Sequence, residues 1–169
     1  MSRSTGTAAR TTATRLGLLA LAAATVGCDR VTKHIATRVL EGEPTRSYLG
    51  DTVRVTYAEN TGGFLSLGAS LPDGVRTAVF TIATGLALLA LAAAALRGRF
   101  SGLRLAALVL FVAGGASNWI DRALRGSVVD FLNVGIGPLR TGIFNVADMA
   151  IMLGALLFLL AELRKRSTD

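Results

Sequence analysis

The chain has few of the residues on which several common kinds of site depend. A single cysteine, Cys28, excludes an internal disulfide framework and a multi-cysteine metal site. The only histidine, His34, has no companions at metal-ligand spacing, and no Ser/His/Asp arrangement or phosphate-binding glycine loop is present. Aromatic residues make up 6% of the chain, which leaves little material for stacking nucleic-acid bases. These shortages argue against a nucleic-acid-binding protein and against a metal site of ordinary composition.

Charge is also scarce, and apolar sequence takes its place. Only 17% of the 169 residues are charged, 51% are hydrophobic, and the mean hydropathy is +0.53, which is unusual for a soluble domain. Three apolar blocks each approach the roughly 20 residues that a helix needs to cross a bilayer. A fourth block, 16–28, spans only if its helix continues through Asp29 to about residue 36. The sequence therefore predicts an all-α membrane protein with four transmembrane helices, at about 16–36, 75–96, 103–120 and 143–163.

The distribution of basic residues predicts the orientation of these helices. Although the net charge is +7, the Lys and Arg residues gather at the ends of apolar blocks. They lie in a polar tail (1–14), in the connection at 97–104 and at 164–166. By the positive-inside rule these three clusters are cytoplasmic, so both termini of a multi-pass inner-membrane protein face the cytoplasm. The segments 41–74 and 121–142 then face outward.

The outward segment 41–74 carries a β pattern. Val53, Val55 and Tyr57 alternate with polar residues, which is typical of a half-buried strand. We expect a small extracytoplasmic β-cradle in about 41–74, a disordered tail at 1–14, and a single membrane domain at 15–166.

The first 28 residues allow a different interpretation. A basic start, an apolar stretch and Thr25-Val-Gly-Cys28 resemble a bacterial lipoprotein signal, whose cleavage would make the chain itself a lipoprotein. Thr25 matches that signal poorly, and a mature lipoprotein seldom carries three further spans. Cys28 is therefore interpreted as a small residue in helix packing.

Polar and ionisable residues gather where the predicted spans reach the outer surface. Because such groups are costly in a membrane, they are functional candidates. They form clusters that would all meet at one face of the membrane, which predicts one composite site. The clusters are Asp29–Lys33, Asn60–Phe64, Asn118–Arg122, Gly126–Phe131 and Phe144–Asp148.

Two carboxylates in these clusters are set in apolar sequence. Asp130 lies between Val129 and Phe131, and Asp148 lies one turn inside the fourth span. Two buried carboxylates that approach each other share one proton, which is the chemistry of an aspartic protease. Alternatively, either residue caps a helix or pairs with Arg122 or Arg125.

The remaining polar residues suit supporting roles. Asp29 and Lys33 are spaced i, i+4 and so predict an ion pair, with a structural role favoured over a catalytic one. Asp121 and Arg122 are adjacent and point in different directions, which leaves Arg122 free to offer its fork of donors to a carbonyl or headgroup oxygen. The uncharged residues Asn60, Asn118 and Asn145 either hold an extended peptide or cap helices.

In this order the motifs resemble those of the lipoprotein signal peptidase (signal peptidase II) family, from about residue 16 to residue 163. The most diagnostic are Gly-x-Val-x-Asp-Phe at 126–131 and Phe-Asn-x-Ala-Asp at 144–148. The resemblance implies a monomeric aspartic endopeptidase, without metal or cofactor, in the bacterial inner membrane. It would cut prolipoproteins before their diacylglyceryl-modified cysteine, in contact with membrane lipids and not nucleic acid. Implied roles are catalysis for Asp130 and Asp148, substrate binding for Asn60, Asn118, Arg122 and Asn145, and site lining for Asp29, Lys33, Gly62 and Asp121.

The chain departs from the family pattern in two places. The segment from Asn60 to Phe64 is one residue short, and Ser117 stands where the family usually has glycine. We expect both departures to affect substrate contacts rather than the carboxylates, as in a divergent paralogue. Two other functions fit part of the pattern. One is a small membrane carrier with buried aspartates, although no repeats or half-helices are found. The other is a relative that binds lipopeptides without cutting them.

Overall fold

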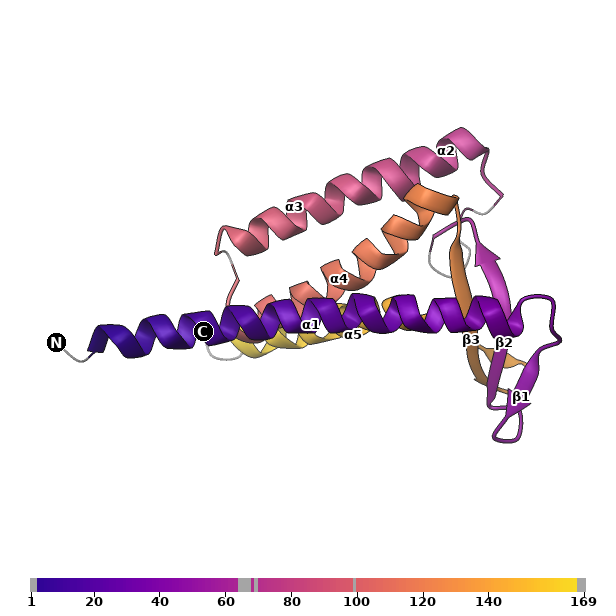
Figure 1. Ribbon diagram of the computed structural model, residues 1–169, viewed down its shortest axis with the longest axis horizontal. Coiled ribbons are helices and arrows are strands. Elements are labelled where there is room, and N and C mark those ends of the chain that lie inside the picture. The colour runs from indigo at the N-terminus through magenta and orange to yellow at the C-terminus, as the bar shows by residue number, and fades with distance from the viewer. Residues whose placement is uncertain (1–2, 64–67, 69, 99, 167–169) are drawn as a thin grey trace.

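The computed structural model describes residues 3–63, 68, 70–98 and 100–166. Long helices run lengthwise through the molecule, and a small antiparallel sheet closes one end of it (Figure 1). Both termini, and the turn that joins α3 (Thr84–Leu96) to α4 (Gly102–Arg125), lie at the opposite end. The basic clusters of the sequence therefore share one end of the molecule.

The first helix, α1 (Arg3–Leu40), is longer than its predicted span of 16–36. The sequence predicts a disordered tail at 1–14, but within the described residues the helix already begins at Arg3. Starting a helix is unfavourable, but adding residues to an existing one is not. The polar residues before the apolar run can therefore continue its helix. Residues 1 and 2 lie outside the described part of the chain.

Among the described residues, three helical rods are long and apolar enough to cross a membrane: Asp73–Leu96, Gly102–Arg125 and Val146–Lys165. The first joins α2 (Asp73–Thr77), the π-helical segment η2 (Ala78–Ala83) and α3, and the third lies in α5 (Val146–Arg166). These rods confirm that the apolar blocks predicted at 75–96, 103–120 and 143–163 are largely helical. The apolar run of α1 is interrupted sooner, by Asp29, Arg30 and Lys33.

The sheet is assembled from two distant parts of the sequence. Its strands β1 (Arg46–Tyr48), β2 (Val53–Asn60), β3 (Val128–Ile136) and β4 (Leu139–Arg140) lie in that order and are antiparallel. The strand predicted around Val53 is confirmed, but β3 is an addition to the predicted cradle. In the β2–β3 register Ala58 faces Asp130, and a bulge interrupts the pairing between Val55 and Ala58.

Close packing of α4 on α5 sets the position of the polar residues between them. A Cβ atom on Gly114 would lie 2.5 Å from the carbonyl oxygen of Ala147, and one on Gly154 would lie 2.6 Å from that of Ala107. Only glycine allows the two backbones to approach so closely, as in membrane helix pairs generally. The C-terminal end of α4 and the N-terminal end of α5 are thereby brought together next to the sheet.

Candidate active site

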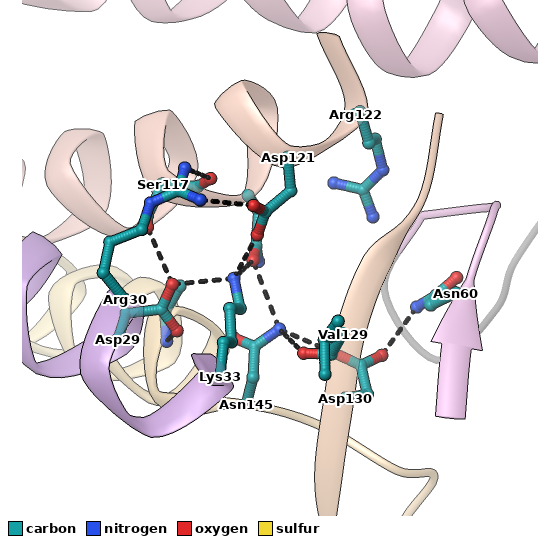
Figure 2. A network of polar contacts seen from close by, with 12 residues as sticks. Asp29, Arg30, Lys33, Asn60, Ser117, Asp121, Arg122, Val129, Asp130 and Asn145 are labelled. Carbon is teal, nitrogen blue, oxygen red and sulfur yellow. Dashed lines mark hydrogen bonds and ion pairs between the residues drawn. The ribbon is translucent and has the colours of Figure 1, made fainter. Parts of the chain in front are cut away.

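Asp130 lies in the interior of β3 with 2% of its surface exposed. Its Oδ2 accepts a hydrogen bond from Asn60 Nδ2 (2.9 Å), and its Oδ1 accepts one from Asn145 Nδ2 (2.6 Å). Figure 2 shows the carboxylate between these two amides. Burial, together with the charge of Asp148, raises the pKa of Asp130 to about 6 against the opposing effect of the Asn60 hydrogen bond. Asp130 can therefore hold a proton close to neutral pH.

Asp148 lies in the first turn of α5, 8% exposed. Asn145 is the N-cap of this helix, and the two residues form a reciprocal capping box. The backbone N–H of Asp148 donates to Asn145 Oδ1 (3.0 Å), and the backbone N–H of Asn145 donates to Asp148 Oδ2 (3.1 Å). The other carboxylate oxygen, Oδ1, accepts from Asn118 Nδ2 (2.9 Å). The capping interpretation of Asp148 is thus correct, and it leaves the carboxylate inside the polar cluster.

Asn145 connects the two carboxylates directly, since its side chain donates to Asp130 and its backbone to Asp148. The alternative that these aspartates pair with Arg122 or Arg125 is not observed, because the ion pairs of the described residues include neither carboxylate. In the same part of the chain no three His, Cys, Asp or Glu side chains are grouped to hold a metal ion. The site therefore contains two buried carboxylates held by neutral donors.

A balanced ionic cluster lies beside this pair, between α1 and α4. Lys33 Nζ is 2.7 Å from Asp29 Oδ2 and 2.8 Å from Asp121 Oδ2, and Arg30 pairs with the second oxygen of Asp121. The ion pair predicted from the i, i+4 spacing is confirmed. Asp29 is fully buried, and its Oδ1 also accepts the backbone N–H of Ala147 (2.8 Å), so it ties α1 to the start of α5.

Lys33 links the ionic cluster to the carboxylate pair through Asn118. Lys33 Nζ donates to Asn118 Oδ1 (2.7 Å). An ammonium group can only donate, so the oxygen of the Asn118 amide must face Lys33 and its NH₂ must face Asp148. Asn145 Nδ2 also approaches Asn118 Oδ1, at 3.2 Å. The charge of Lys33 thus fixes the direction of the hydrogen bond to Asp148.

Arg122 lies at the edge of the cluster and points away from Asp121, as adjacency on a helix predicts. Its Nε and one terminal nitrogen both donate to the carbonyl oxygen of Gly62, at 2.9 and 2.7 Å. The backbone N–H of Gly62 in turn donates to Asn60 Oδ1 (3.0 Å). Arg122 therefore holds the turn that carries Asn60. Phe64, the end of the shortened motif, lies outside the described residues.

The structure brings all ten sequence-predicted site residues into one connected cluster, and it adds Arg30 and Ser117. Ser117 is fully buried and donates to Asp29 Oδ2 (2.7 Å). The hydroxyl of Ser117 thus serves the ionic cluster, and the expectation that this departure from the family pattern affects substrate contacts stays a prediction. The inclusion of Arg30 could have been predicted from the sequence, because it directly follows Asp29 and lies i, i+3 from Lys33 on the same helix.

Comparison with known proteins agrees with this geometry. A family model described as signal peptidase (SPase) II matches residues 21–164. A lipoprotein signal peptidase of Sphingopyxis alaskensis is 39% identical over 151 residues, which cover 88% of this chain and 86% of that protein. Another, from Janthinobacterium sp., is 37% identical and covers 87% of this chain and 88% of its own length. A solved structure of a bacterial membrane enzyme, 27% identical, superposes with a TM-score of 0.77 over 90% of this chain and 91% of that one. By the match over most of its length, the chain belongs to the signal peptidase II family.

Proposed function

We propose that this protein is a membrane aspartic endopeptidase that removes signal peptides from prolipoproteins by cutting before the diacylglyceryl-modified cysteine. The observation that carries the proposal is the pair of buried carboxylates, Asp130 and Asp148, joined through Asn145 without a cation on either. Family membership and the names of the relatives agree with this substrate and this reaction.

The proposed chemistry divides one proton between the two carboxyl groups. The ionised group takes a proton from a water molecule, whose oxygen attacks the carbonyl carbon of the scissile peptide bond. The protonated group donates to the developing oxyanion and, as the C–N bond breaks, a proton passes to the leaving amine. The raised pKa of Asp130, about 6, fits a group that holds or releases a proton near neutrality.

The surrounding residues act mainly by orienting the pair. Asn60, Asn118 and Asn145 donate to the carboxylates, and Arg122 acts through the Gly62 turn that carries Asn60. We assign a substrate-binding role to these four residues as well, because amides and guanidinium groups suit an extended peptide backbone. Asp29, Lys33 and Asp121 support the site from the α1–α4 interface.

The proposed topology has four spans, with α1 as the first. Its charged residues are costly in a membrane only if they lack partners, and Asp29 and Lys33 are paired within the protein. With the basic end of the molecule in the cytoplasm, the carboxylates lie at the outer face of the bacterial inner membrane. The enzyme is proposed to act there as a monomer.

The direct test is cleavage of a diacylglyceryl-modified prolipoprotein by purified protein in detergent. Asp130→Asn and Asp148→Asn are each expected to abolish release of the signal peptide, since an amide keeps the shape and cannot carry out the proton transfer. Asp73→Asn is a matched control, because the Asp73 side chain is 90% exposed and its ion pair is with Arg76, outside the polar cluster. Substantial cleavage by either site variant would refute the assigned pair, and binding without cleavage by the unchanged protein would indicate a non-catalytic relative.

The same assay tests the lipid requirement. Each CH₂ group moved out of water contributes about 0.8 kcal/mol, whereas the peptide's hydrogen bonds are already satisfied by water. The unmodified prolipoprotein is therefore expected to be a much poorer substrate. Equal cleavage of both forms would instead indicate a general intramembrane protease.

A further inference from the structure

An apolar groove lies on the molecule away from the carboxylate pair, in the corner between the end of α1 and the sheet. Its volume is about 260 Å³. Ile35 and Val39 of α1 form one wall, and Tyr48, Val55 and Phe131 of the sheet form the other. None of the residues that donate to Asp130 or Asp148 lines it. Phe131 follows Asp130 on β3, and successive side chains of a strand point to opposite faces, so the groove and the carboxylate belong to different faces.

The groove continues an exposed apolar stripe of α1. Val31, Ile35 and Val39 are 58%, 53% and 45% exposed, and their i, i+4 spacing places them on one side of the helix. The ionic residues Asp29 and Lys33 are buried against α4 instead. In the proposed topology this stripe faces the lipid chains of the outer leaflet.

The sheet extends over this stripe. In Figure 1, β1 lies beyond α1, on the side away from α3 and α4. The sheet also exposes large apolar side chains. Leu49, in the turn after β1, is 79% exposed, and Leu139, at the start of β4, is 83% exposed. Exposed apolar groups of this size are costly in water and are typical of a surface that contacts another apolar phase.

A cation stands at the rim of the groove. Arg46 lines it and donates through one terminal nitrogen to the carbonyl oxygen of Val39 (3.3 Å). A guanidinium group has five N–H donors, and its planar fork suits the oxygens of a phosphate. The groove thus combines apolar walls with a cation at its rim. A phospholipid has the matching parts, an apolar acyl chain and an anionic phosphate.

We propose that a phospholipid of the outer leaflet binds in this corner, with an acyl chain between α1 and the sheet and its phosphate on Arg46. The inference rests on the proposed topology, in which the sheet lies at the outer surface. The bound lipid fills the space between the overhanging sheet and α1, and so supports the strand that carries Asp130 from its opposite face.

The test counts phospholipid molecules that stay on the protein when it is released from nanodiscs of palmitoyl-oleoyl phosphatidylglycerol and examined by native mass spectrometry. Ile35→Trp fills the groove and is expected to lower lipid occupancy at least about fivefold, because several CH₂ contacts are lost. Leu156→Trp is the matched control, since Leu156 is also 53% exposed and does not line the groove. Arg46→Gln should lower occupancy, whereas Arg38→Gln, which removes the same charge from the last turn of α1, should not.

Equal retention by the unchanged protein and Ile35→Trp would overturn the proposal. A competition experiment identifies the source of the acyl chain. A diacylglyceryl prolipoprotein is added to Asp130→Asn, which is expected not to cleave it. Retention of the phospholipid supports the proposal, and its displacement assigns the groove to the substrate and overturns it. These readouts do not use cleavage, so they can fail while the proposed activity stands.

Discussion

At the residue scale, Asn145 combines two tasks that the sequence presents as alternatives. As an N-cap it satisfies the backbone N–H of Asp148, and its side-chain amide at the same time donates to Asp130 and approaches Asn118. A capping oxygen is needed for the first task, and an NH₂ group is needed for the second. Asparagine is the residue that supplies both from one short side chain.

These two tasks can be separated by substitution. Serine is an N-cap of similar strength to asparagine but has no amide. Asn145→Ser should therefore keep the cap and lose the buried hydrogen bond to Asp130, at a cost of about 1–3 kcal/mol of stability. Its cleavage rate should fall by about 100-fold or more, because Asp130 loses the group that orients it. Asn145→Ala removes the cap as well and should cost about 1 kcal/mol more than Asn145→Ser. Cleavage assays and thermal unfolding in detergent measure both effects. An active Asn145→Ser would show that the amide bridge is dispensable.

The raised pKa of Asp130 predicts a pH dependence of stability. Its pKa is about 6 in the folded protein, against about 3.9 in an unfolded chain. Between these values the folded protein keeps a proton that the unfolded chain has lost, so stability falls as pH rises from about 4 to about 6 and then levels off. Asp130→Asn has an amide that does not titrate, so its stability does not fall for this reason. Its stability relative to the unchanged protein should therefore increase across that window, by at most about 3 kcal/mol.

The fluorescence of the single tryptophan, Trp119, can follow unfolding in detergent at each pH. Its Nε1 donates to the carbonyl oxygen of Thr81 (2.7 Å), so it reports on the contact between α4 and η2. Parallel stability curves for the two proteins between pH 4 and pH 7 would contradict the raised pKa of Asp130.

At the scale of elements, the ionic cluster joins α1 to α4 and α5. Removing Asp29 leaves Lys33 and Ser117 without one of their partners in a buried interface. Asp29→Ala should therefore cost about 3–5 kcal/mol of stability. Asp73→Ala is the matched comparison, because Asp73 also pairs with a basic residue, Arg76, but its side chain is 90% exposed. A surface pair of this kind contributes about 0–1 kcal/mol. If Asp29→Ala unfolds normally and is inactive, Asp29 belongs to the catalytic machinery instead.

These elements also show which features of the fold can be predicted from the sequence and which cannot. Span positions follow from the length and hydropathy of apolar blocks, and Asp29–Lys33 follows from helical spacing. The strand β3 has no alternation at its start, because Val128 to Phe131 are all buried, and a short apolar run of this kind does not reveal its conformation. Similarly, α5 begins at Val146 and not at 143, because Phe144 pairs with Leu132 and Asn145 caps the helix.

The long-range contacts in the site cannot be predicted from the sequence either. Lys33 reaches Asp121 and Asn118 across more than eighty positions of sequence. Their convergence at one end of the molecule could be predicted, since all the clusters lie at the outer ends of spans. Which amide faces which carboxylate could not, because it depends on the close packing that Gly114 and Gly154 allow between α4 and α5.

At the scale of the whole molecule, the topology depends on whether α1 crosses the membrane. If the three apolar rods all cross the membrane, the connection between α3 and α4 lies on one side and the sheet on the other. The C-terminus then lies on the same side of the membrane as that connection, whether or not α1 crosses. The N-terminus alone distinguishes the two arrangements, because it joins the C-terminus only if α1 spans.

We therefore predict that reporters fused to the N-terminus, after residue 98 and after residue 166 all behave as cytoplasmic, while one inserted near Thr52 behaves as exported. The physical reason is that Arg3, Arg10 and Arg15 hold the start of α1 on the cytoplasmic side, and Asp29 and Lys33 can enter the outer part of the membrane as a neutralised pair. Asp29→Ala gives a further check on this reasoning. It leaves the cluster of Arg30, Lys33 and Asp121 with one excess positive charge, which should lower the fraction of molecules with a cytoplasmic N-terminal reporter. An exported N-terminal reporter in the unchanged protein would place α1 on the outer surface and remove the membrane-facing stripe of Val31, Ile35 and Val39.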